Sequence, residues 1–236
     1  MLPFYFTSMF LNLISKNKPK FTPVIDSRFN KDDYTLLDLS STNRELNEVD
    51  LSNAFAVQNY IDKVLSKDNS KVAYGGYLEV RDIYKRSEYF NQPTLSNDER
   101  NIHLGVDIWA KAGTAVLTPL DGIVHSFNNN TNHGDYGPTI VLKHHLQGVC
   151  FYTLYGHLSI GSINSLSVGQ KFEGNSKIAE LGDSSVNGDY APHLHFQVIL
   201  DMQDKKGDYP GVCSQNNVEF YKRNCPDPML LLNIES

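Results

Sequence analysis

Residues 191–199 read APHLHFQVI and place two histidines, His193 and His195, inside an apolar run typical of a β-strand. Side chains alternate between the two faces of a strand, so His193 and His195 share one face while Leu194 and Phe196 occupy the other. Two imidazoles on one face of a core strand carry a desolvation cost unless they line a groove or bind something. A ligand or metal site on this face is therefore a reasonable expectation.

A second motif supplies a carboxylate. Residues 103–107 read HLGVD and place His103 and Asp107 four positions apart with Gly105 between them. An extended chain spans about 13 Å over four residues, so the chain must bend for both side chains to reach one metal ion, and Gly105 permits the bend. His103, Asp107 and one of the two later histidines form a set that suits a catalytic zinc or a non-heme iron. Zinc is favoured because the remaining histidines suit hydrolysis.

A third motif, YGHLS, places His157 after Tyr155 and Gly156 at the end of a predicted strand, where a side chain can overhang a groove. A packed aromatic is the expected role of Tyr155. The other histidines, His125, His133, His144 and His145, match no motif and are expected at solvated positions.

In their order and separation, HLGVD, YGHLS and PHLHFQV resemble the three motifs of the lysostaphin-type, LytM-like zinc metallopeptidases, a family of cell-wall endopeptidases. The resemblance covers roughly residues 100–200. It implies that His103, Asp107 and His195 bind one zinc ion and that His157 and His193 are the catalytic pair. The implied substrate is a peptide bond in the cross-links or stem peptides of peptidoglycan, and the implied fold is the duplicated hybrid motif with a groove across a small antiparallel sheet.

The expected mechanism follows from this set of residues. Zinc lowers the pKa of a bound water towards about 7 and polarises the scissile carbonyl group. One of the histidines of the pair would transfer the proton of the water to the leaving amine, and the other would stabilise the oxyanion.

Short runs rich in Val, Ile, Thr and aromatic residues follow one another from about residue 71 to residue 200, separated by Gly, Pro, Asn and Asp. This spacing predicts a mainly β fold with an antiparallel barrel or sandwich core. Before it, residues 53–67 show helical periodicity with Asn53 as N-cap, and Met9, Phe10, Leu13 and Ile14 suggest another helix. Three regions are predicted: a partly helical segment at 1–70, the metallopeptidase domain at 71–200 and a loop-rich extension at 201–236 that packs on the domain.

Composition restricts the class of partner. The net charge of −6 and the scattered Lys and Arg residues make nucleic acid an unsuitable partner. The apolar N-terminal stretch is too short to cross a membrane, and no basic residue precedes it as in a signal peptide, which slightly favours a cytoplasmic protein over a periplasmic or extracellular one. Cys150, Cys213 and Cys225 form no C-x-x-C pair and are expected as free thiols.

Other functions remain open at this point. A non-enzymatic LytM-like binding or regulatory module would typically lack a metal ligand, whereas this set is complete. A histidine phosphocarrier would also pair two histidines, but it has no use for Asp107. The loop between Gly182 and His193 is longer than the compact turn usual in the family, which leaves the substrate preference open. The tail, with GDYPGV and CPDP, resembles a lineage of the family found in intracellular proteins, so an intracellular peptide other than the cell wall is a further candidate substrate. The N-terminal segment could also cover the groove as an inhibitory layer.

Overall fold

The computed structural model describes residues 4–87, 99–232 and 234, and most of its regular structure is β-strand. The helices are α1 (Phe4–Asn17), α2 (Ala54–Lys67) and α3 (Val218–Asn224). The strands are β1 (Tyr34–Leu36), β2 (Val72–Gly75), β3 (Arg100–His103), β4 (Val106–Trp109), β5 (Ala115–Leu117), β6 (Gly122–Asn130), β7 (Gly137–Leu146), β8 (Val149–Gly156), β9 (Lys171–Phe172), β10 (Lys177–Glu180), β11 (His193–Ile199) and β12 (Val212–Ser214).

One large sheet organises the molecule. Its eight strands follow the order β1-β2-β4-β11-β8-β7-β6-β9, and two small sheets pair β10 with β5 and β12 with β3. All neighbours in the large sheet are antiparallel except β1 and β2. Among the described residues, β1 and β9 end the sheet without meeting, so the core is an open, sandwich-like sheet and the alternative of a closed barrel is wrong.

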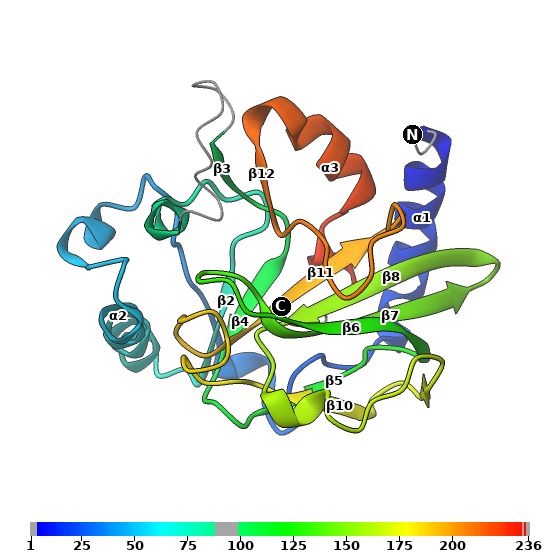
Figure 1. Ribbon diagram of the computed structural model, residues 1–236, viewed down its shortest axis with the longest axis horizontal. Coiled ribbons are helices and arrows are strands. Elements are labelled where there is room, and N and C mark those ends of the chain that lie inside the picture. Colours follow the sequence, from blue (N-terminus) through cyan, green and yellow to red (C-terminus); the bar gives the residue numbers. More distant parts are fainter. Residues whose placement is uncertain (1–3, 88–98, 233, 235–236) are drawn as a thin grey trace.

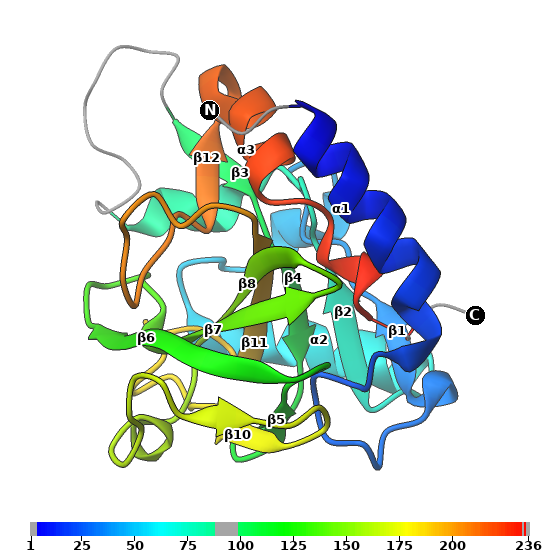
Figure 2. The same ribbon diagram turned by 90° about the vertical axis from the view of Figure 1, so that its right-hand side faces the viewer.

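The two faces of the central strands have different environments. On β11, Leu194 and Phe196 join the main hydrophobic core, together with Phe10 of α1. His193 and His195 point to the opposite face, as the strand alternation predicts. Figure 1 shows α1 and α2 on opposite sides of the molecule, and Figure 2 shows α1 running along one side of it. The histidines therefore lie on the face away from α1.

Both predicted helices of the N-terminal segment are present. In α2 the side chain of Asn53 accepts hydrogen bonds from the backbone N–H groups of Phe55 and Ala56, which confirms the N-cap. Residues of this segment also take part in the fold of the rest of the chain: β1 pairs with β2, and Phe10 packs edge-on against Phe151 at 5.1 Å between ring centroids. The division into regions 1–70, 71–200 and 201–236 stays a prediction.

Two local expectations need correction. The C-terminal tail is not only loops, because it forms strand β12 and the two-turn helix α3. His144 is fully buried, although a solvated position is predicted for it, whereas the adjacent His145 is exposed. Strand β7 lies between β6 and β8, so one residue of an adjacent pair must point into the core.

Tyr155 is a packed core aromatic, as expected. Cys213 and Cys225 are buried free thiols, and Cys150 is a half-buried one. No helix in the described part of the chain has the length and apolar character needed to cross a membrane.

Candidate metal centre

Strand pairing brings the three predicted motifs together. In the antiparallel pair of β11 with β4, His195 lies directly opposite Asp107 and His193 opposite Trp109. On the other side of β11, His195 lies opposite Gly156, the residue that precedes His157. Residues directly opposite one another on antiparallel strands project to the same face, so the register places Asp107 and His195 side by side. His103 reaches this point from the end of β3.

The ligand-type atoms of His103, Asp107 and His195 form a compact triangle. Nε2 of His103 lies 2.9 Å from Nδ1 of His195 and 3.3 Å from Oδ1 of Asp107. Nδ1 of His195 lies 3.2 Å from the same Oδ1. All three side chains are buried. Three ligands held about 2 Å from a tetrahedral zinc ion would stand about 3.3 Å from one another, so these separations fit the ion.

The outer hydrogen bonds of both histidines determine which of their nitrogens face this triangle. Nδ1 of His103 lies 2.9 Å from the carbonyl oxygen of Gly76, which only accepts, so this nitrogen carries the proton. Nε2 of His195 lies 2.9 Å from Oε1 of Gln197, and the amide nitrogen of Gln197 donates to the carbonyl of Pro210, so Nε2 of His195 also carries a proton. Nε2 of His103 and Nδ1 of His195, which face the triangle, are therefore unprotonated and present lone pairs.

Three acceptors that face one another within about 3 Å repel each other unless a cation lies between them. Burial in the protein lowers the pKa of His103 to about 4, with the nearby Arg81 charge acting in the same direction, so His103 is neutral at pH 7. Burial alone would raise the pKa of Asp107, but His103 and Arg81 hold it well below its ordinary value, so this carboxylate is ionised. Two neutral imidazoles and one carboxylate are the ligands that a divalent metal needs.

A second pair of histidines lies beside the triangle. The rings of His157 and His193 are 4.2 Å apart between centroids, and Nε2 of His193 lies 3.8 Å from Oδ1 of Asp107. Nδ1 of His157 donates to the carbonyl of Asn187, and Nδ1 of His193 donates to the carbonyl of Ala191, each at 2.8 Å. Both imidazoles consequently keep Nε2 as a proton acceptor.

The backbone and the surrounding rings fix this pair. His157 has a φ of +63°, a left-handed conformation that is uncommon for a residue other than glycine and that occurs often at functional sites. Trp109 stacks on His193 with 5.6 Å between centroids, and Tyr190 contacts both imidazoles edge-on. Burial lowers the pKa of both histidines, so neither carries a charge at neutral pH.

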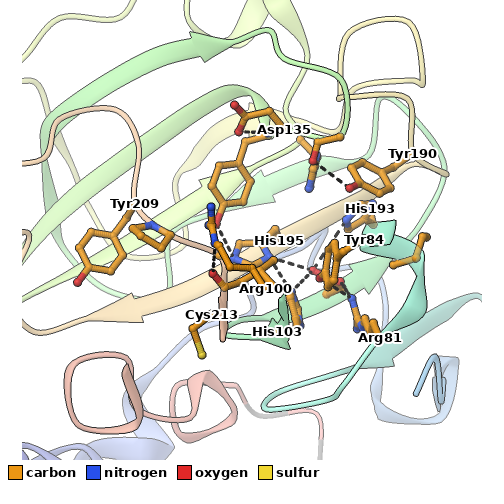
Figure 3. A pocket seen from close by; sticks show the side chains of 18 of the residues that line it. Arg81, Tyr84, Arg100, His103, Asp135, Tyr190, His193, His195, Tyr209 and Cys213 are labelled. Atoms are coloured by element: carbon orange, nitrogen blue, oxygen red, sulfur yellow. Dashed lines mark hydrogen bonds and ion pairs between the residues drawn. The ribbon is translucent and has the colours of Figure 1, made fainter. Parts of the chain in front are cut away.

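A cavity of about 330 Å³ opens onto all five of these residues. Figure 3 shows His103, His193 and His195 converging beside Tyr84 and Arg81, with Asp135 and Tyr209 further from the cluster. The N-terminal segment supplies Leu39 and Val57 to the cavity wall, and the C-terminal extension supplies Tyr209 and Tyr221. Both flanking regions therefore shape the cavity.

Three residues that contact the centre are not predicted by the sequence motifs. Arg81 forms an ion pair with Asp107, Gln197 accepts the hydrogen bond from His195, and the hydroxyl of Tyr136 lies 3.3 Å from Nε2 of His195. Gln197 could have been found, because it follows His195 by two positions and so shares its face of the strand. Arg81 and Tyr136 carry no local signal, since they reach the site only through the fold.

The chain bends at Gly105, between β3 and β4, as the motif predicts. Gly105 has a φ outside the positive range, so it is not needed for an unusual backbone conformation. A Cβ at this position would lie only 2.6 Å from Cε1 of His195, which is closer than such atoms approach in real structures. Gly105 therefore provides space for the imidazole of His195.

Comparison with known proteins places this centre in a family context. Residues 101–207 match the family described as peptidase family M23, and this stretch contains all five residues of the centre. No curated protein matches the chain.

Several solved structures are similar over part of the chain. A zinc-containing peptidase from Vibrio cholerae is 31% identical over 42% of this chain, with a TM-score of 0.34, and a peptidase M23 homologue from Pseudomonas aeruginosa is 18% identical over 56%, with a TM-score of 0.36. This chain spans 28% and 44% of the length of these two proteins. The catalytic domain of the antimicrobial peptidase lysostaphin from Staphylococcus simulans is 25% identical over 66% of this chain and 94% of its own length, with a TM-score of 0.39.

Proposed function

We propose that the protein is a zinc-dependent endopeptidase that hydrolyses amide bonds in the cross-links or stem peptides of peptidoglycan, because residues 101–207 match peptidase family M23. The observation that carries the catalytic part of this proposal is the triangle of His103, Asp107 and His195, in which three lone-pair donors face one another within 2.9–3.3 Å. Only a cation stabilises such an arrangement, and two imidazoles with one carboxylate leave a fourth position open for water or substrate.

When bound there, zinc supplies a Lewis acid that acidifies a water molecule and polarises a carbonyl group. The protein supplies the proton transfer. His157 and His193 both present Nε2 to the cavity, and their Nδ1–H groups are held by the carbonyls of Asn187 and Ala191. One imidazole takes the proton from the attacking water and passes it to the leaving amine. The other, next to it, stabilises the negative charge on the carbonyl oxygen once its own Nε2 carries a proton, because an unprotonated Nε2 only accepts hydrogen bonds.

The proposed substrate class rests on the family and on the order of the three motifs. The cavity supports it through its lining, in which polar and aromatic side chains surround the candidate metal ligands. Peptides outside the cell wall are the competing substrates, since the loop between Gly182 and His193 departs from the usual family pattern and His157 is anchored on this loop through Asn187.

The first experiment measures bound metal and peptidoglycan cleavage in the same preparation. One zinc ion per chain and release of fragments that stops with a chelator and returns with added zinc are the expected results. Asp107→Ala and His195→Ala should lose both zinc and cleavage, whereas His193→Ala should keep zinc and lose cleavage. His145→Ala is the matched control, because His145 is exposed on β7 and lies outside the cavity lining.

Each alternative has its own outcome. Stoichiometric zinc in both ligand variants would overturn the ligand assignment. Zinc binding with cleavage of synthetic peptides but not of peptidoglycan would keep the peptidase and replace its substrate. A wild-type protein that binds no zinc would contradict the proposal as a whole.

A further inference from the structure

We propose that Arg81, which lies outside the stretch matched to the family, is a positioning residue that orients Asp107 for metal binding. The inference rests on the proposed function only in taking His103, Asp107 and His195 as the metal ligands. Arg81 stands next to the short 3-10 helix Asp82–Arg86, and 26 positions separate it from Asp107 in the chain.

The two carboxylate oxygens of Asp107 have different partners. Nη1 of Arg81 lies 2.5 Å from Oδ2, and both side chains are only 3% exposed. Oδ1 faces the two histidines at 3.3 Å and 3.2 Å. Because Oδ2 is engaged by the guanidinium, Asp107 offers a single oxygen to the metal, which suits a four-coordinate zinc ion. The same contact prevents the carboxylate from rotating.

Arg81 is itself fixed on several sides. Its Nε atom lies 2.5 Å from Oε2 of Glu79, and Oε1 of Glu79 accepts a hydrogen bond from the backbone N–H of Leu39 at 3.2 Å. The guanidinium also lies 5.7 Å from the centre of the Trp109 ring. A continuous polar chain therefore runs from the N-terminal segment through Glu79 and Arg81 to the carboxylate of Asp107.

Stability alone does not account for this arrangement. Burying an ion pair carries a large desolvation cost, and an apolar replacement of similar volume is often as stable. Nη2 of Arg81 is also buried without a hydrogen-bond partner. It lies against Gly76, where a Cβ would collide with it. Hydrogen bonds from outside the ligand set generally orient metal ligands. We therefore explain the buried guanidinium, with its unpaired N–H group, by its role in orienting the carboxylate of Asp107.

The test measures metal affinity and metal geometry separately from catalysis. Zinc dissociation constants of the full chain are determined by competition with a chromophoric chelator, and the visible absorption spectrum of the cobalt-substituted protein reports the ligand geometry. Arg81→Met should weaken zinc binding by about 10-fold to 100-fold, the usual effect of removing an outer partner, and should change the cobalt spectrum. Arg81→Lys, which keeps the charge but loses the planar fork, should recover part of the affinity.

Lys85→Met is the matched control, because Lys85 lies in the adjacent helical turn and forms an exposed ion pair with Asp82. It should bind zinc with the wild-type affinity. If Arg81→Met fails to fold, Glu79→Gln provides the second route, since it keeps the shape of the side chain but removes the charge that holds Arg81. This variant should weaken zinc binding several-fold and shift the cobalt spectrum.

The inference is wrong if the folded Arg81 variants bind zinc with the wild-type affinity and give the wild-type cobalt spectrum. If Arg81→Met does not fold, it is wrong if Glu79→Gln leaves both the zinc affinity and the cobalt spectrum unchanged. Both differ from failure of the proposed function, which would appear in the wild-type protein as absence of zinc or of amide-bond cleavage.

Discussion

His144 should make the protein sensitive to acid independently of the metal centre. It is fully buried on β7, stacks on Phe151 and has both ring nitrogens engaged. Nδ1 donates to the carbonyl oxygen of Asp121 at 2.8 Å, and Nε2 lies 2.7 Å from the hydroxyl of Thr153. Burial lowers the pKa of His144 from 6.5 to about 4, because the interior disfavours the charged imidazole.

The size of the effect follows from this pKa difference. The unfolded chain binds a proton at His144 once the pH falls below 6.5, whereas the folded protein does so only near pH 4. His144 therefore leaves stability unaffected at neutral pH and destabilises the fold progressively between these two values. Each pKa unit corresponds to about 1.36 kcal/mol, so the full loss is about 3 kcal/mol, of which about 2.5 kcal/mol is reached by pH 4.5.

The measurement is the free energy of unfolding in urea between about pH 7.5 and pH 4.5, with metal removed from all samples. His144→Asn keeps a donor near Asp121 but cannot take up the proton. The other buried histidines titrate in both proteins, so the difference between the two proteins isolates His144. The wild type should lose about 2.5 kcal/mol more than the variant over this range. Parallel pH curves would refute the reasoning, because they would mean that His144 has the same pKa in both states.

Three further outcomes concern the metal centre. Gly105→Ala should weaken zinc binding at least tenfold, because the added methyl group would lie 2.6 Å from the ring of His195 and 2.9 Å from the backbone oxygen of Phe196; equal affinity in a competition titration would contradict the packing argument. Gln197→Leu removes the acceptor of the His195 N–H and should raise the zinc dissociation constant by about tenfold, whereas a change in unfolding temperature alone would assign Gln197 a structural role only. His193→Ala should keep stoichiometric zinc in elemental analysis but lose amide-bond cleavage, and retention of full cleavage would remove His193 from the catalytic pair.

The sequence predicted those parts of the site that depend on local periodicity. Alternation along a strand places His193 and His195 on one face, and both line the cavity while Leu194 and Phe196 join the hydrophobic core. The same alternation shows that one residue of the pair His144 and His145 must point inwards, but which one depends on the core that covers β7. The hydropathy of the sequence does not show which of the two histidines is buried, because it is the same for a buried neutral histidine with two hydrogen-bond partners and for a solvated histidine.

Contacts set by strand register and by the flanking regions were not predictable. Asp107 meets His195 because β4 pairs with β11 in one particular register, and a shift of one residue would have turned them to opposite faces. Arg81 belongs to no motif and reaches Asp107 from a separate 3-10 turn. Helix α3 was missed for another reason, since its seven residues are too few for a helical period to stand out from the surrounding turns.

The polar chain from Leu39 through Glu79 and Arg81 to Asp107 connects the N-terminal segment to one of the candidate metal ligands. We expect coupling along this chain, and by thermodynamic reciprocity zinc would then stabilise the segment around Leu39, which also lines the cavity, by the same free energy with which an ordered segment tightens zinc binding. The Leu39 amide should consequently exchange its hydrogen more slowly in the zinc-loaded protein than in the metal-free one.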